Sequence, residues 1–203
     1  MELKMNTCKT IEHKKDSIKL RSDIRKSIEY GFFTITDPWL SDIKSVKDYV
    51  ELENVDVTVE NNLAIYLATK YGHLELVKYL VEKGADIHVD DDYPLFVASV
   101  YGHFELVQFL VEKGANIHSK ETRSLLASSS RGYLNIVKYL VKKGANVKAS
   151  NDYSVRHACY HGHLAVVIFL IVNGADIHAC NNEALRWAKL QGHKEIADYI
   201  REL

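Results

Sequence analysis

The residues with the clearest potential for chemistry stand close together, at His157, Cys159, His161 and His163. Two histidines four positions apart share one face of a helix, a spacing that suits a zinc ion. A metal-binding protein or metal-dependent enzyme centred on His157 and His161 is therefore one hypothesis. Against it, no glutamate completes an H-E-x-x-H motif, and ideal helical geometry turns Cys159 away from the face of the two histidines.

Motifs for other reactions are missing from the sequence. No glycine-rich phosphate loop follows an expected strand, no serine occupies a G-x-S-x-G motif, and no carboxylate pair departs from the repeat pattern described below. We therefore expect no catalytic residues, no metal and no cofactor, and the sequence favours a protein that is not an enzyme.

The charge balance and the cysteines narrow the class of partner and the compartment. Lys and Arg (26) nearly equal Asp and Glu (27), so no net field favours nucleic acid or an anionic membrane. The three cysteines are odd in number, and the charged first residues contain no apolar stretch of a signal peptide. The apolar run 164–172 is about half of the roughly 20 residues that cross a bilayer. We expect a monomeric, intracellular, cytoplasmic protein with reduced thiols.

The elements that position these residues follow a repeat. One set of glycines recurs in steps of 30 residues, and a second set follows it: Gly72, Gly102, Gly132, Gly162 and Gly192, then Gly84, Gly114, Gly144 and Gly174. A fixed period of this length is typical of repeat architectures. Ten positions before each glycine of the first set stands a residue suited to an N-cap: Asn62, Asp92, Thr122, Asp152 and Asn182. The spacing predicts a first helix of about nine residues in every unit.

A second helix is expected between the two glycines of each unit. Its apolar residues recur at helical spacing, as in the columns of Leu76 and of Leu80. Each unit also has one small residue in its first helix, where a neighbour must pack closely: Ala68, Ala98, Ser128, Ala158 and Ala188. Helices this short are marginal alone, so the units must stack. The pattern predicts an all-α solenoid of stacked helix-turn-helix repeats with a 30-residue period.

The expected organisation has three parts. Residues 1–36 form an irregular N-terminal segment with a capping helix and a short strand, and residues 37–58 form a degenerate first repeat that lacks the hinge glycine. Residues 59–203 hold five repeats. In the last repeat Lys194 and Arg201 replace apolar residues of the earlier units, which predicts a polar C-terminal cap.

The segments GHLELVKYLVEKGADIH (Gly72 to His88) and NNEALRWAKLQGHKEIADYI (Asn181 to Ile200) resemble ankyrin repeats. The resemblance covers about residues 55–203, with a unit of 30 rather than about 33 residues, which implies short finger loops. Of the T-P-L-H segment only Pro94-Leu95 is present. The short units are similar to the ankyrin proteins of giant DNA viruses of amoebae, which implies an intracellular, host-facing protein.

The resemblance implies that an unidentified protein partner lies in a concave groove made by the finger loops and the first helices. The residues expected to bind it are Tyr71, Tyr93, Tyr101, Arg123, Arg131, Tyr153, Tyr160 and His161. Tyr and Arg suit such a surface because they bury area while keeping a polar group. A second aromatic column, which includes Tyr139, is expected to pack between repeats. The histidines at 88, 118 and 178 are expected to make structural hydrogen bonds.

Overall fold

The computed structural model describes residues 59–203. The expected N-terminal segment (1–36) and degenerate repeat (37–58) lie outside the described residues. The chain divides into two compact units, residues 1–86 and 87–203, which are described separately. In the first unit, α3 (Val59–Lys70) and α4 (Leu74–Glu82) form an antiparallel pair. Ile65, Ala68 and Val77 lie between them with no exposed surface.

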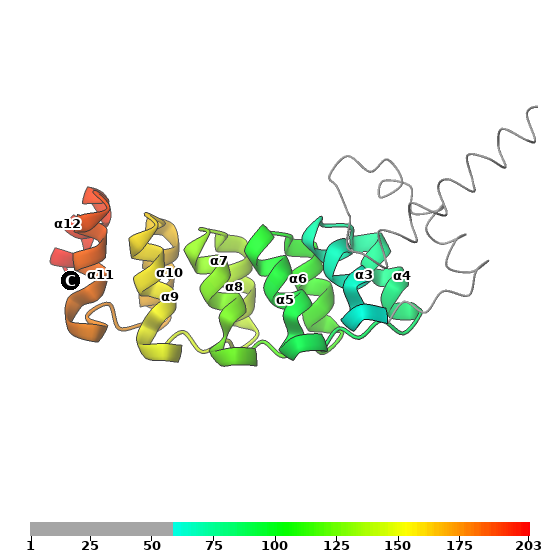
Figure 1. Ribbon diagram of the computed structural model, residues 1–203. Helices are drawn as coiled ribbons and strands as arrows, with labels where there is room; N and C mark the ends of the chain where they lie inside the picture. The colour runs from blue at the N-terminus through cyan, green and yellow to red at the C-terminus, as the bar shows by residue number, and fades with distance from the viewer. Residues whose placement is uncertain (1–58) are drawn as a thin grey trace, which may run out of the picture. The chain divides into compact units, whose positions relative to one another are not determined.

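The second unit consists of four helix pairs placed side by side (Figure 1). The pairs are α5 (Val89–Tyr101) with α6 (Phe104–Glu112), α7 (Arg123–Ser130) with α8 (Leu134–Lys142), α9 (Ala149–Tyr160) with α10 (Leu164–Val172), and α11 (Ala179–Leu190) with α12 (Lys194–Arg201). A 3-10 turn, η1 (Ser119–Glu121), precedes α7. The second helices begin 30 residues apart, and residues 59–203 contain no strand. The predicted all-α repeat fold is confirmed.

The apolar columns of the sequence form the core. Ile65, Leu95, Leu125 and Val155 of the first helices are fully buried, while Leu185 is partly exposed. All five residues of the small column have no exposed surface. Their size matters because neighbouring first helices, such as α7 and α9, pack directly on each other. No helix in the described part of the chain is both long and apolar enough to span a membrane.

The hinge glycines Gly132 and Gly162 are required both by their backbone conformation and by a ring from the next repeat. Gly162 has a φ of 82°, and a Cβ built on it would lie 2.6 Å from Cε1 of His193. Nε2 of His193 donates a hydrogen bond to the carbonyl oxygen of Tyr160 at 3.0 Å. His163 covers Gly132 in the same way and donates to the carbonyl of Ser130 at 3.0 Å. The Gly-His pattern therefore joins each of the last two repeats to the one before it, while the ring of Tyr133 covers Gly102.

The second helices end as their glycines predict. In α8 the N–H of Ala145 bonds to the carbonyl of Leu140 at 2.9 Å, and the N–H of Gly144 bonds to that of Val141 at 2.9 Å. These two bonds satisfy carbonyls that the helix leaves free, and Gly144 adopts a φ of 101°. The Nζ of Lys143 lies 5.5 Å from the centre of the Tyr139 ring. The same pair of bonds ends α4, at Gly84 and Ala85.

The capping prediction for the first helices is corrected by the structure. Asp90, Asp91 and Asp92 all have positive φ, so a short left-handed turn precedes the helix proper, and equivalent turns lie at 150–152 and 180–182. Asn and Asp are the non-glycine residues that tolerate this region best. Thr122 makes no side-chain capping bond. Oδ1 of Asp92 instead accepts from the N–H of Asn116 at 3.0 Å, and Oδ1 of Asp152 accepts from the N–H of Asp176 at 2.8 Å.

Two of the loop histidines support these turns. Nδ1 of His88 lies 2.7 Å from Oδ1 of Asp92, and Nδ1 of His178 lies 2.7 Å from Oδ1 of Asn182. Because both oxygens can only accept, the ring nitrogens must donate. The prediction of structural hydrogen bonds is confirmed for these two histidines. Each ring ties the start of a left-handed turn to its last residue.

Candidate functional site

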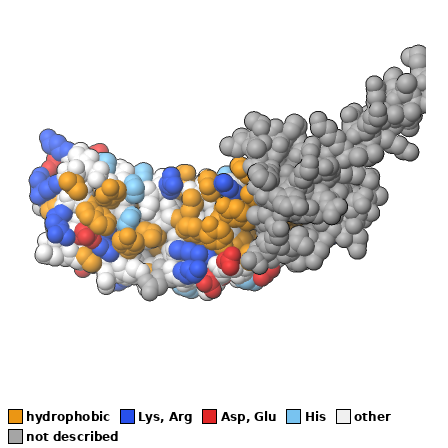
Figure 2. All heavy atoms as spheres, viewed as in Figure 1, with side chains coloured by type: hydrophobic (Ala, Val, Ile, Leu, Met, Phe, Trp, Pro, Cys, Tyr) orange, Lys and Arg blue, Asp and Glu red, His pale blue; other side chains and the backbone are white. Residues whose placement is uncertain are grey.

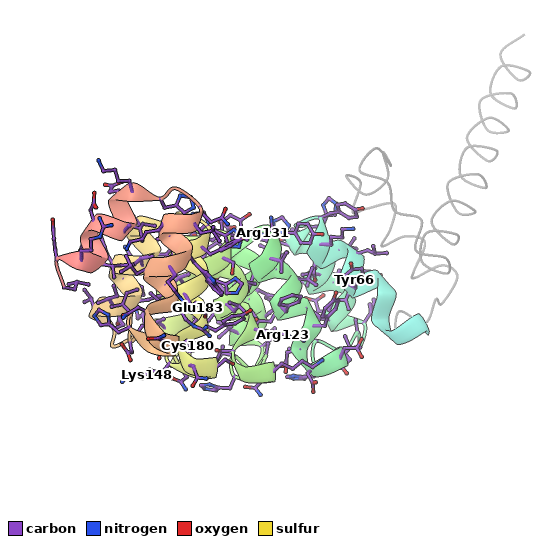
Figure 3. All side chains as sticks on the ribbon, turned by 60° about the vertical axis from the view of Figure 1, so that its left-hand side comes forward. Tyr66, Arg123, Arg131, Lys148, Cys180 and Glu183 are labelled. Carbon is purple, nitrogen blue, oxygen red and sulfur yellow. The ribbon has the colours of Figure 1, made fainter. Side chains whose placement is uncertain are left out.

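The exposed sides of α5, α7, α9 and α11, with the turns at their two ends, form a surface that we call the first-helix face. In Figure 2 hydrophobic side chains gather in separate areas, with Lys, Arg and His side chains between them. Figure 3 places Arg131 at one end of the helices, Lys148 and Cys180 at the other end, and Arg123 and Glu183 between them. Seven of the eight predicted binding residues belong to this unit, and Tyr71 belongs to the first unit.

Arg123 of α7 is held against the neighbouring helix α5. Its guanidinium carbon lies 5.4 Å from the centre of the Tyr93 ring and 5.0 Å from that of Phe96. Nη2 donates to the carbonyl oxygens of Asp90 at 2.9 Å and Asp91 at 2.5 Å. Arg123 therefore stacks on the aromatic pair and also closes over the left-handed turn of the preceding repeat. The structure brings together two residues that were predicted separately, Tyr93 and Arg123.

A second arginine, Arg156 of α9, also lies within an aromatic cluster, although at a different position in its repeat, and it was not predicted. Arg156 is 7% exposed, and its guanidinium carbon lies 4.9 Å from the centre of the Tyr153 ring and 5.8 Å from that of Trp187. Nη1 pairs with Oε2 of Glu183, and Nη2 donates to the carbonyl of Ser150 at 3.2 Å. A buried guanidinium needs such partners because an unpaired buried charge is costly.

The aromatic part of this cluster extends along α9. His157 lies 4.1 Å from Tyr153 and 5.4 Å from Trp187, measured between ring centres, and both contacts are edge-on. The rings of Tyr160 and Trp187 also make an edge-on contact, with 5.6 Å between the ring centres. Edge-on contacts between aromatic rings are favourable beyond the area that they bury. Tyr153 and Tyr160, predicted as separate binding residues, are thus parts of one packed cluster with Trp187.

His157 is held neutral by its surroundings. Burial lowers its pKa, and the nearby His161 and Arg156 lower it further, while Glu183 opposes the shift. Its Nε2 atom is buried and has no hydrogen-bond partner. Protonation would place a second cation beside the guanidinium of Arg156 in an environment with little water.

We expect the lowered pKa of His157 to make stability depend on pH. Above about pH 6.5 the ring is neutral in both the folded and unfolded chain, so it contributes no dependence. As the pH falls below that value, the unfolded chain takes up the proton first, and the free energy of unfolding decreases until the folded pKa is reached. Chemical unfolding between pH 7.5 and 5 should show a smaller decrease for His157→Gln than for the wild type. An identical decrease in both would contradict the assignment.

The turns that follow the first helices form an exposed rim. Tyr101 is 47% exposed, and Arg131 and His161 are exposed as well. Ser130, Arg131, His161 and His163 line an open depression of about 630 Å³. Burial and the nearby His163, Arg131 and His193 lower the pKa of His161. The rim can therefore offer a guanidinium, a neutral imidazole and a tyrosine to a partner.

The metal hypothesis gains no further ligand from the structure. The ring centres of His157 and His161 lie 6.0 Å apart, but Cys159 has no exposed surface, and burial raises the pKa of its thiol to about 12. Cys159 belongs to the packed core, as its predicted orientation implied. Among residues 59–203 no three His, Cys, Asp or Glu side chains converge on a point that could hold a metal ion.

The second aromatic column also has a structural role. Tyr139 of α8 meets the ring of Phe104 edge-on at 5.9 Å, so it packs against the preceding repeat. Burial and the nearby carboxylate of Glu112 raise its pKa. The prediction that this column packs between repeats is confirmed for Tyr139. Its residues form part of the scaffold behind the first-helix face.

Comparison with known proteins is consistent with this architecture. A family model described as ankyrin repeats, in three copies, matches residues 40–121, 90–151 and 124–203. A search of curated proteins finds no match. The matched ranges contain every helix of the described residues.

Proposed function

The chain belongs to the ankyrin-repeat family, and from that premise we propose that it is a non-enzymatic module that holds another protein against its first-helix face. Members of this family generally mediate protein–protein interaction. The proposed contact surface is a groove formed by the exposed rim, at the turns that follow the first helices, and by the left-handed turns that precede them. The residues proposed to line it are Tyr93, Tyr101, Arg123, Arg131, Tyr153, Tyr160 and His161, and Tyr71 of the first unit is proposed as a further residue that binds the partner.

The observation that carries the proposal is the fixed position of Arg123 and Arg156 within aromatic clusters. Both guanidinium groups already have several partners in the free chain, so binding would cost little additional side-chain entropy. Aromatic and arginine side chains dominate the binding energy of many interfaces. Beside these fixed groups, Tyr101 and Arg131 remain exposed and can be covered by a partner.

Three narrower parts of the proposal rest on the sequence. The short units support a role like that of the ankyrin proteins of giant amoebal viruses, inside a host cell and with a host protein as partner. We also propose that residues 1–36 and 37–58 cover one end of the repeat array and that the last repeat covers the other. The exposure of Lys194 and Arg201 supports the assignment of the last repeat as the C-terminal cap.

We expect replacement of both Tyr101 and Arg131 by Ala to weaken capture of the partner by about tenfold or more, since two interface anchors would be lost. The midpoint of thermal unfolding should change little, because both side chains are exposed. The measurement is affinity capture from the expressing cells, with the captured proteins quantified by mass spectrometry.

The matched control is Glu105→Ala, in the second helix of the repeat that carries Tyr101, where the side chain is also exposed. This control should retain the partner in full. Undiminished capture by the double variant would place the binding surface elsewhere on the chain. Equal loss in the control and the double variant would also contradict the assignment.

A further inference from the structure

Helix α10 differs from every other second helix in the residues that it presents outward. At its three outward positions stand Ala165, Ile168 and Val172, all exposed, with Val172 at 78% and Ile168 at 37%. The equivalent positions of α6 are Glu105, Gln108 and Glu112. Because α10 needs only its buried side to pack against α9 and its neighbours, the fold does not account for an apolar outer side.

The two helices beside α10 carry opposite charge at the same positions. On α8 the outward residues are Asn135, Lys138 and Lys142. On α12 they are Glu195 and Asp198, followed by Glu202 directly after the helix. Both helices contact α10 directly. Nζ of Lys138 lies 6.0 Å from the Phe169 ring of α10, so the lysine row borders the apolar strip. We call this three-helix surface the α10 strip: apolar in the middle, cationic on the α8 side and anionic on the α12 side.

This arrangement is complementary to itself. A two-fold rotation about an axis that runs along α10 lays the strip of one copy on that of another with the two α10 helices parallel. The rotation exchanges the two sides, so α8 of one copy faces α12 of the other. Residues 60 positions apart occupy equivalent positions in repeats that are two units apart. In the dimer Lys138 therefore lies opposite Asp198, and Lys142 opposite Glu202, of the second copy. Two such seams flank the apolar contact.

We propose that the α10 strip is a self-association surface, on which two copies of this chain form a dimer with parallel α10 helices. The charges decide between the two two-fold arrangements. An axis perpendicular to the helices would place lysines of α8 against lysines, and carboxylates of α12 against carboxylates, which costs free energy. Asp198 also pairs within the chain with Arg201, at 2.7 Å, so Lys142 and Glu202 carry the clearest intermolecular pair. The proposal departs from the monomer expected from the sequence.

The first experiment is sedimentation equilibrium of the full chain over a range of concentrations. We expect a dimer with a dissociation constant on the order of 10 µM, since the apolar contact is small. Ile168 lies near the axis and would meet its own copy, so Ile168→Glu should raise the dissociation constant about 100-fold through like-charge contact. Gln108→Glu introduces the same residue at the equivalent position of α6, outside the α10 strip, and should leave the dissociation constant of the dimer unchanged.

The second experiment is a charge-exchange cycle on Lys142 and Glu202. Lys142→Glu and Glu202→Lys should each raise the dissociation constant about tenfold, because two symmetric pairs are lost at once. The double variant should restore the wild-type value. Within one chain the two side chains are two helix spacings apart, roughly 20 Å, which prevents direct pairing. Restoration therefore reports a contact between copies in the parallel arrangement.

Several results would overturn the proposal. A wild-type chain that stays monomeric at about ten times the expected dissociation constant excludes the dimer. Equal weakening by Ile168→Glu and Gln108→Glu places the contact elsewhere. A double variant that is weaker than either single variant excludes the parallel arrangement. Circular dichroism melting of each variant establishes that it is folded, and Lys142 and Glu202 are exposed, so their substitution leaves the core intact.

Discussion

Replacing Leu140 with Ala is expected to lower the free energy of unfolding by about 2 to 5 kcal/mol. Leu140 is 1% exposed in the core column of α8, where it lies between neighbouring repeats. Truncation removes its buried methyl groups and leaves a cavity that short helices with many neighbours cannot easily close. Because each unit is stabilised largely by its neighbours, the loss should also weaken the adjoining interfaces. Urea unfolding followed by circular dichroism measures the effect.

Leu190→Ala is the control for this experiment, since it makes the same chemical change at a side chain that is 76% exposed. Its free energy of unfolding should stay within about 0.5 kcal/mol of the wild type. A negligible loss in Leu140→Ala would show that the register of α8 is wrong. Equal losses in both variants would show that burial does not distinguish the two sites.

Gly162→Ala should be the second costly substitution, at about 3 kcal/mol. A residue with a Cβ at a φ of 82° costs roughly 1 to 2 kcal/mol. The new Cβ would also lie 2.6 Å from Cε1 of His193, so the ring must move and its bond to the carbonyl of Tyr160 is put at risk, for roughly another 1 to 3 kcal/mol. The comparison is Gly144→Ala, where φ is 101° but no atom lies within 4 Å.

The difference between these two glycine variants isolates the contribution of the histidine ring. Gly144→Ala should cost about 1 to 2 kcal/mol, from backbone strain alone. In the double variant Gly162→Ala/His193→Ala the clash is absent, so its cost should be smaller than the sum of the single costs. Strict additivity in urea unfolding would mean that the ring does not rest on the glycine.

Much of the fold could be predicted from the sequence because the same physical constraint recurs every 30 residues. A small residue at Ala158 or a leucine at Leu140 is informative only in a column of similar residues, and each column corresponds to one packing position. The ends of the second helices were equally predictable, since a glycine after a lysine marks a left-handed C-terminal turn.

Contacts between repeats were less predictable, because they depend on how far a side chain reaches into its neighbour. Aspartate is a residue type that favours N-cap positions, yet the carboxylate of Asp92 accepts a hydrogen bond from the N–H of Asn116 in the next loop, because a left-handed turn precedes the helix. Sequence periodicity cannot distinguish these two uses of one aspartate. His193 follows a hinge glycine in the sequence, but its bond to the previous repeat becomes visible only in the structure.

The same limit applies to the candidate site. Tyr93 and Arg123 were predicted as separate contacts, and the structure shows that they stack on each other. Arg156 was missed because its partners, Trp187 and Glu183, belong to the following repeat. A useful signal was present, since an arginine in one first helix and a glutamate 27 residues later lie on adjacent helices in a 30-residue array.

The histidine that rests on the preceding hinge glycine also limits how such an array can grow or shrink. Each of these contacts reaches only into the adjoining repeat. Unequal crossing-over that removes residues 133–162 would join Gly132 directly to His163. His193 would then cover Gly132 and find the carbonyl of Ser130 in place of that of Tyr160. A gain or loss of 29 or 31 residues offers no such replacement. Loss or gain of a whole 30-residue unit, or 90 nucleotides of coding sequence, therefore leaves these contacts with a replacement partner.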